Sequence, residues 1–174
     1  MRKIFCIRTI GLQMITFCTL LFCACHKEDA DGYTMETHDF VLSVLNEQAF
    51  QMALLERLAK NPSRKVIEEM VNARKKFSAE YISELSNVNM SGQIPVTVSL
   101  SAEQIRALSA IDQKSGPSYE EELMKNLMDS DQGIIAFHVK AASNSGVSNG
   151  MIRNWAEAKL PALRANLTKT QNLK

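Results

Sequence analysis

The sequence has no cysteine after residue 25: its four cysteines are Cys6, Cys18, Cys23 and Cys25. The remainder of the chain therefore cannot form an internal disulfide or offer thiolates to a metal, and its fold must depend on packing. An excess of charge of one sign is also missing, because 20 Lys and Arg residues are balanced by 19 Asp and Glu residues. No strong electrostatic field indicates nucleic acid as a partner.

A long hydrophobic run is found only near the start of the chain. Three basic residues within positions 2–8 precede the apolar stretch 10–23, which is too short and too poorly flanked for a stable membrane span. Ala24 is the small residue that a signal peptidase requires before Cys25. We therefore predict a lipoprotein signal peptide over residues 1–24 and lipid attachment at Cys25, which would anchor the protein to a membrane without spanning it.

The residues before Cys25 resemble the lipobox of bacterial lipoproteins. That motif usually has an aliphatic residue three places before the cysteine, whereas this chain has Phe22 there and Leu21 one place earlier. An ordinary secretory signal with an incidental cysteine is the alternative. The resemblance implies a bacterial protein that is lipid-anchored in the cell envelope, at the outer membrane.

The segment after Cys25 is charged and poor in apolar residues, so we predict a flexible tether over residues 25–37. Lys27-Glu28-Asp29, a lysine followed by acidic residues, resembles the surface-export signal of lipoproteins from the Bacteroidetes group. A solvated spacer without an address is the alternative. The domain can therefore face either the periplasm or the cell surface.

Hydrophobic periodicity predicts an all-α domain over residues 38–172. The region contains apolar residues at three- and four-residue steps, separated by Asn61-Pro62, Gly116-Pro117 and a segment at 89–100 of different character. Ser63 is a candidate cap for the second helix, and capping-box patterns begin at Ser101 and Ser118. The predicted helices cover residues 39–60, 63–88, 101–111, 118–143 and 151–167, with Pro161 expected to kink the last one. This pattern predicts a four-helix bundle, with a long crossover and a short extra helix between its second and third long helices.

Met70-Val71 and the ending Leu160-Pro161-Ala162-Leu163-Arg164-Ala165-Asn166-Leu167 resemble motifs of the domain of unknown function 4142 family. The resemblance covers roughly residues 40–167 and implies an exported, divergent family member with a ferritin-like helical bundle. Family members commonly carry three histidines, whose positions correspond here to Arg74, Asp131 and Asn166. Because none of these residues is a histidine, a ferritin-like metal site is not carried over.

Arg74 and Asp131 interrupt the apolar stripes of the predicted second and third long helices, so both are expected to point inward. A guanidinium facing a carboxylate can persist in a core when further hydrogen bonds are made. We predict a buried Arg74–Asp131 pair with Asn166 nearby. The alternative is that slight helix rotation places one or both charges at the solvated rim.

His138 is a further candidate, because it follows Asp131 by seven residues and can share its face. It could act as a ligand or an acid–base group, and the alternative is a core or rim histidine satisfied by one hydrogen bond. The histidines and carboxylates show neither His-x-x-x-His nor Glu-x-x-His spacing, so we expect no metal site and no cofactor.

The sequence therefore predicts a non-catalytic structural or binding component of the cell envelope. The competing class is a metal-binding or stress-related ferritin-like enzyme, which would require His138, His38, Glu47 or Glu56 to converge. A third class is a module for an unidentified envelope protein partner, which predicts an exposed apolar patch over residues 94–100.

Overall fold

The computed structural model describes residues 32–60, 63–89, 94 and 96–173. The predicted signal peptide, Cys25 and most of the predicted tether lie outside these residues. Residues Tyr33–Lys174 form one compact unit. Within the described ranges, this unit contains helices and no strand, which confirms the all-α prediction. The helices are α2 (Thr37–Lys60), α3 (Lys65–Val88), α4 (Ala102–Ile111), α5 (Pro117–Ala142) and α6 (Gly150–Gln171).

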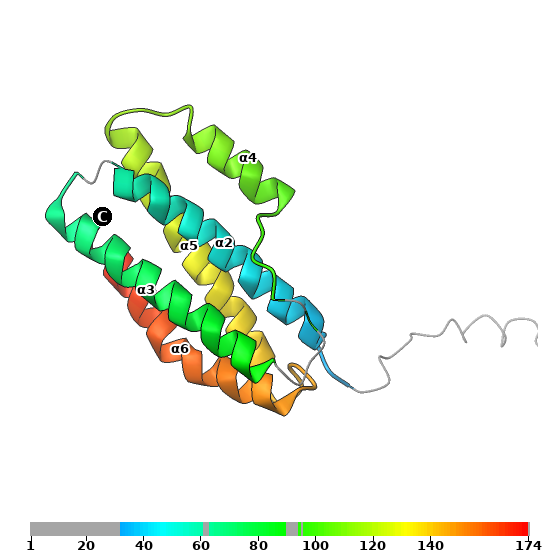
Figure 1. Cartoon of the computed structure of the whole chain (residues 1–174). Coiled ribbons are helices and arrows are strands. Elements are labelled where there is room, and N and C mark those ends of the chain that lie inside the picture. Colours follow the sequence, from blue (N-terminus) through cyan, green and yellow to red (C-terminus); the bar gives the residue numbers. More distant parts are fainter. Residues whose placement is uncertain (1–31, 61–62, 90–93, 95, 174) are drawn as a thin grey trace, which may run out of the picture. The chain divides into compact units, whose positions relative to one another are not determined.

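The four long helices pack side by side around a common core (Figure 1). Helix α2 contacts α3 and α5, and α6 contacts the same two helices from the other side. In chain order these helices run up, down, down and up, so α3 and α5 are parallel (Figure 1). The segment between Val88 and Pro117, which includes α4, takes the chain back along the length of the bundle (Figure 1). The predicted long crossover and its short extra helix are therefore present.

The core consists of two apolar clusters along the bundle. The first contains Phe40, Tyr81, Ile134 and Trp155, and the second contains residues such as Leu54, Ile67, Leu123 and Leu127. Burying one such large side chain stabilises the fold by about 1.5–3 kcal/mol, which explains how the unit can fold without disulfides. The buried side chains that lie between the two clusters on each helix are polar: Gln48 and Gln51 on α2, Arg74 and Ser78 on α3, Asp131 on α5 and Thr170 on α6.

One predicted capping box is confirmed. The Ser101 hydroxyl accepts the Gln104 backbone N–H at 3.2 Å, and the Gln104 side-chain oxygen accepts the Ser101 N–H at 2.9 Å. The helix that follows ends at Ile111, as predicted. Because this motif is closed within four residues, the local sequence is sufficient to define it.

The other two helix starts differ from the prediction. Helix α3 has Arg64 at its N-cap, and the Ser63 hydroxyl instead donates to Glu120 at 2.8 Å. Helix α5 begins at Pro117, with Gly116 at its N-cap in a positive-φ conformation, so Ser118 is already inside the helix. A partner on another helix replaces the local cap in the first case, and proline at the first helical position defines the start in the second.

Ordered contacts begin earlier than predicted, and the last helix ends later than predicted. Residues 33–37 were expected in the tether, but the backbone N–H groups of Thr34 and Met35 donate to the carbonyls of Ser145 and Gly146. Met35 also packs against the first apolar cluster. At the other end, α6 continues through Pro161 to Gln171, four residues beyond the predicted end.

The described residues of the crossover, 94 and 96–100, do not form the exposed apolar patch expected for a partner-binding module. Ile94 and Val96 pack against the first apolar cluster, and Leu100 packs against the second. Only Val98, at 41% exposure, is a strongly exposed large apolar residue among the described crossover positions. The apolar residues of this segment are used to cover the bundle's own core.

None of the helices in the described ranges combines the length and the apolarity that crossing a membrane would require.

Candidate functional site

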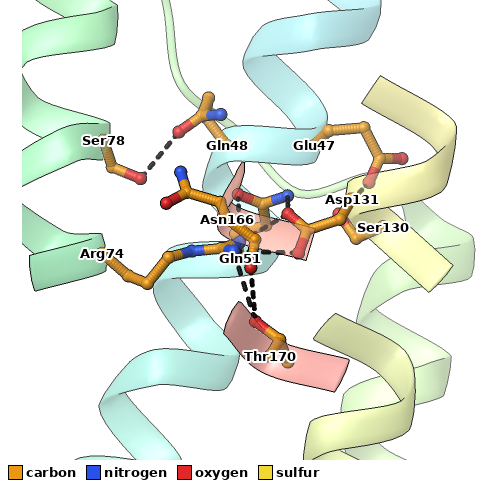
Figure 2. A network of polar contacts seen from close by, with 9 residues as sticks. All are labelled: Glu47, Gln48, Gln51, Arg74, Ser78, Ser130, Asp131, Asn166 and Thr170. Carbon is orange, nitrogen blue, oxygen red and sulfur yellow. Dashed lines mark hydrogen bonds and ion pairs between the residues drawn. The ribbon is translucent and has the colours of Figure 1, made fainter. Parts of the chain in front are cut away.

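The centre of the bundle contains an ion pair between Arg74 of α3 and Asp131 of α5 (Figure 2). The guanidinium binds the carboxylate in a bidentate manner, with Nη1–Oδ2 and Nη2–Oδ1 distances of 2.9 and 2.5 Å. The two side chains are only 4% and 2% exposed. Both side chains therefore point into the bundle, and neither charge lies at the solvated rim.

Gln51 of α2 and Thr170 of α6 complete this polar network. Gln51 donates through Nε2 to Asp131 Oδ1 at 3.0 Å and accepts from Arg74 Nη2 at 3.2 Å. Thr170 Oγ1 accepts from Arg74 Nη1 at 3.5 Å and donates to the backbone carbonyl of Asn166 at 3.1 Å. All four long helices thus contribute to one set of contacts, in which each oxygen of Asp131 has a donor.

Asn166 lies near the ion pair, as predicted, but outside its hydrogen bonds. Its side chain is half-buried and, among the described residues, accepts or donates no hydrogen bond to Arg74 or Asp131. It lies beside Arg74 along a shared groove between α3 and α6. Thr170, one helical turn later, provides the contact from α6 because the helix continues beyond the predicted end.

Gln51 and Thr170 were missed by the sequence analysis. Gln51 follows Gln48 by three residues within an otherwise apolar stripe of α2, so two inward polar residues on one helix were a usable signal. Thr170 had no such signal, because it lies beyond the residues whose periodicity defines the last helix.

Burial raises the pKa of Asp131, and this effect is opposed by the hydrogen bonds and charge of Arg74 and by the hydrogen bond from Gln51. Nearby, burial also raises the pKa of Glu47, which accepts from the Ser130 hydroxyl and from Gln104 Nε2. The repulsion between Glu47 and Asp131 acts in the same direction. Arg74 is therefore the cation beside two carboxyl groups, Asp131 and Glu47, whose charged forms are both disfavoured by burial.

Gln48, three residues before Gln51 on α2, is also buried and lies beside the polar network (Figure 2). Its Oε1 accepts from the Ser78 hydroxyl at 2.7 Å, but its buried Nε2 has no partner among the described residues. A buried donor without an acceptor typically costs about 1–3 kcal/mol. The buried polar side chains between the two apolar clusters therefore include one saturated ion pair and one amide nitrogen without a partner.

His138 is fully buried within the first apolar cluster, in contact with the rings of Phe40 and Trp155. Its Nδ1 must donate to the Ala156 carbonyl at 2.8 Å, because a carbonyl only accepts. Nε2 therefore accepts the hydrogen bond from the Tyr81 hydroxyl at 2.7 Å. Burial lowers the pKa of His138 to about 4, so the ring is neutral at pH 7. His138 is therefore a core residue, one of the two places that the alternative allowed, and it makes two hydrogen bonds where one was expected.

Among the described residues, the side chains that a metal-dependent enzyme would need do not lie together. Across the part of the chain that the structure describes, no three His, Cys, Asp or Glu side chains form a group able to hold a metal ion. His38 is exposed, 3.6 Å from Asp39. In the central network, Asp131 is occupied by its donors and the adjacent Arg74 guanidinium repels a cation. These residues do not fit a metal.

No family model, no curated protein and no solved structure matches this chain. The fold and the site thus define it as an all-α protein whose helical bundle contains a buried, internally neutralised charge pair.

Proposed function

We propose that this chain is a lipid-anchored bacterial envelope protein whose bundle is a non-catalytic structural or binding component. The export signal and Cys25 support anchoring at the outer membrane, with the domain facing either the periplasm or the cell surface. A binding component of this kind would act on another envelope protein.

We further propose that the bundle is ferritin-like and that the chain is a divergent member of the domain of unknown function 4142 family. The motifs at Met70-Val71 and over residues 160–167 support membership. The up, down, down, up helix order with one long crossover supports the ferritin-like assignment, because bundles of that class have one such connection (Figure 1).

The observation that carries the non-catalytic assignment is the saturation of Asp131. A catalytic metal site keeps an open position and uses carboxylates or histidines with free lone pairs. Here the Asp131 oxygens accept from Arg74 and Gln51, and the pair is neutral overall. The centre of the bundle is therefore suited to holding four helices together and not to activating a substrate.

Elemental analysis of the purified chain tests this proposal. The protein is purified without chelators and measured before and after incubation with iron, manganese and zinc. We expect no tightly bound metal in either sample. Near-stoichiometric metal would contradict the proposal and favour the metal-binding or stress-related enzyme class.

A variant with histidines at all three corresponding positions serves as the matched control: Arg74→His, Asp131→His and Asn166→His together. Three neutral imidazoles at one level of the bundle supply the lone pairs that the native residues lack. If this variant folds and binds zinc while the native chain does not, the equivalence with the family's histidine positions is supported. A folded variant that binds none would contradict that equivalence.

Metabolic labelling with an alkyne fatty acid tests the anchor. We expect the label to be lost in Cys25→Ala and retained in Cys23→Ala, because Phe22 before Cys23 is a poor residue at a cleavage edge. Retention of the label in Cys25→Ala would identify another lipidation site, whereas absence of label from the native chain would identify an ordinary secretory signal.

A further inference from the structure

The start of the domain is held against the turn between α5 and α6. The backbone N–H groups of Thr34 and Met35 donate to the carbonyls of Ser145 and Gly146 at 2.7 and 3.1 Å. The Met35 side chain also packs against the first apolar cluster, which anchors this segment to the core. Together these contacts form a clasp between residues 33–37 and the α5–α6 turn.

Side chains on both sides of the clasp add to the backbone contacts. The Arg153 guanidinium lies 6.0 Å from the centroid of the Tyr33 ring, within the range of a cation–π contact. The hydroxyls of Thr37 and Ser148 are 3.4 Å apart. The clasp therefore fixes the place where the chain enters the domain, which is Tyr33 beside the α5–α6 turn and not the start of α2.

The chain between Cys25 and the clasp is short. Residues 26–32 are seven residues, which span at most about 25 Å when fully extended and about 15 Å on average as a flexible chain. The four long helices have 22 to 26 residues, which corresponds to a length of about 33–39 Å. An acyl group on Cys25 would therefore keep the clasp closer to the bilayer than the bundle is long.

We propose that the bundle faces the bilayer with the end that carries the clasp, and that the bilayer surface is the partner of this end. The inference rests on the proposed lipid attachment at Cys25. The start of α2, the end of α3, the end of α5 and the start of α6 lie together at this end (Figure 1). The opposite end, with the end of α2 and the start of α5, is held away from the membrane. Another envelope protein can reach the bundle there.

The side chains at the clasp end fit this orientation. Val139 in the last turn of α5 and Met151 in the first turn of α6 are 48% and 53% exposed. A lipid interface can shield such apolar side chains from water. Charged side chains of both signs lie at this end: Glu36, Asp39, Lys140 and Arg153. Because these charges offset one another, the clasp and the short tether set the orientation, and an anionic membrane is not required.

The test uses the acylated protein in phosphatidylcholine nanodiscs that contain a lipid with a gadolinium chelate on its headgroup. Removal of residues 1–24 and acylation of Cys25 leave no free thiol, so one introduced cysteine can carry a fluorinated tag. Asn144→Cys, Lys76→Cys and Gln113→Cys place the tag at the clasp end, at the middle of α3 and after α4, at exposed positions. Paramagnetic enhancement of ¹⁹F relaxation reports how near each tag lies to the headgroups.

We expect the enhancement to decrease in the order Asn144→Cys, Lys76→Cys, Gln113→Cys. The first should exceed the last at least about fivefold, because roughly the length of a long helix separates them and the effect falls steeply with distance. A bundle that lies on its side would give similar values at all three positions.

The clasp is tested by Thr34→Pro combined with Met35→Pro, which removes both N–H donors. The free tether then grows to residues 26–36, with a reach of about 40 Å, so the ratio between the Asn144→Cys and Gln113→Cys tags should fall at least about twofold. Thr34→Ala combined with Met35→Leu is the matched control, because it keeps both N–H groups and an apolar side chain, and it should leave the ratio unchanged.

Two results on an acylated, folded chain would overturn this inference and leave the lipid anchor in place: equal enhancement at the three positions, or an unchanged ratio after the two proline substitutions. Circular dichroism establishes that each variant is folded. Mass spectrometry of the N-terminal peptide separates the other case, because a chain without an acyl group would contradict the proposed anchor and this inference together.

Discussion

Replacing Asp131 by alanine is the most direct test of the buried network. The substitution removes the acceptor of two Arg74 hydrogen bonds, at 2.9 and 2.5 Å, and of one Gln51 hydrogen bond at 3.0 Å. Arg74 retains only the Gln51 oxygen at 3.2 Å and Thr170 at 3.5 Å, neither of which carries a charge. The guanidinium is then a buried cation without a counterion.

The expected loss is about 3–5 kcal/mol in the free energy of unfolding, which is the usual cost of removing one member of a buried ion pair. Solvent can relieve little of this cost, because the Arg74 side chain is only 4% exposed. A domain of this size is typically stable by about 5–15 kcal/mol, so the variant would be severely destabilised but can remain folded at low temperature.

Urea unfolding followed by far-UV circular dichroism measures the difference. Asp129→Ala is the matched control, because Asp129 is an exposed aspartate on the same helix and should change stability by less than about 0.5 kcal/mol. A loss below about 1 kcal/mol for Asp131→Ala, at an unchanged urea dependence, would refute the reasoning, because that is what a solvated pair contributes. Replacing the whole unit, Arg74→Met with Asp131→Leu and Gln51→Leu, should cost much less than Asp131→Ala because no charge is left unpaired.

Four further predictions concern other parts of the bundle. Burial lowers the pKa of His138 from 6.5 to about 4, so its stabilising contribution is complete above pH 6.5 and is lost as the pH falls toward 4. The free energy of unfolding should fall by up to about 3 kcal/mol over this range. Urea unfolding at a series of pH values should show a weaker pH dependence of this free energy in His138→Gln than in the native chain. Equal pH dependence in the two proteins would contradict the assignment of His138 as a neutral core residue. Gly133→Ala, inside α5 with free space for the added carbon, should stabilise by about 0.5–1 kcal/mol in thermal unfolding. Gly146→Ala should destabilise by more than about 1 kcal/mol, because its Cβ would overlap carbonyls at the end of α5, and a neutral result would contradict that packing. Gln48→Leu combined with Ser78→Ala should be close to neutral in urea unfolding, whereas Ser78→Ala alone should be destabilising, since only the single change leaves a second amide atom unsatisfied.

The helices were predictable because their signals are local. The first helix ends at Lys60, the second at Val88 and the short one at Ile111, each at or within one residue of its predicted end. Periodicity, proline and the closed capping box at Ser101 act over a few residues and leave clear marks in the sequence. Where a helix start depended on a distant group, as at Ser63 with its partner Glu120, the local pattern predicted the wrong cap.

The site was predictable only in part. The positions of Arg74 and Asp131 in apolar stripes indicated that both point inward, because a charge on a buried face requires a partner. Gln51 and Thr170 are the other partners because of how the helices are rotated and because α6 ends about one turn later than expected. An error of this size exchanges one side chain for the next on the same helix face.

The sequence by itself determined the all-α class, the long crossover and an inward pair of opposite charges, since each of these follows from residue spacing along the chain. The tertiary structure alone decided that Asp131 is saturated, that both His138 nitrogens are used, and that the crossover covers the core. These features depend on distances between helices, and such distances are fixed by the packing of side chains that lie far apart in the sequence.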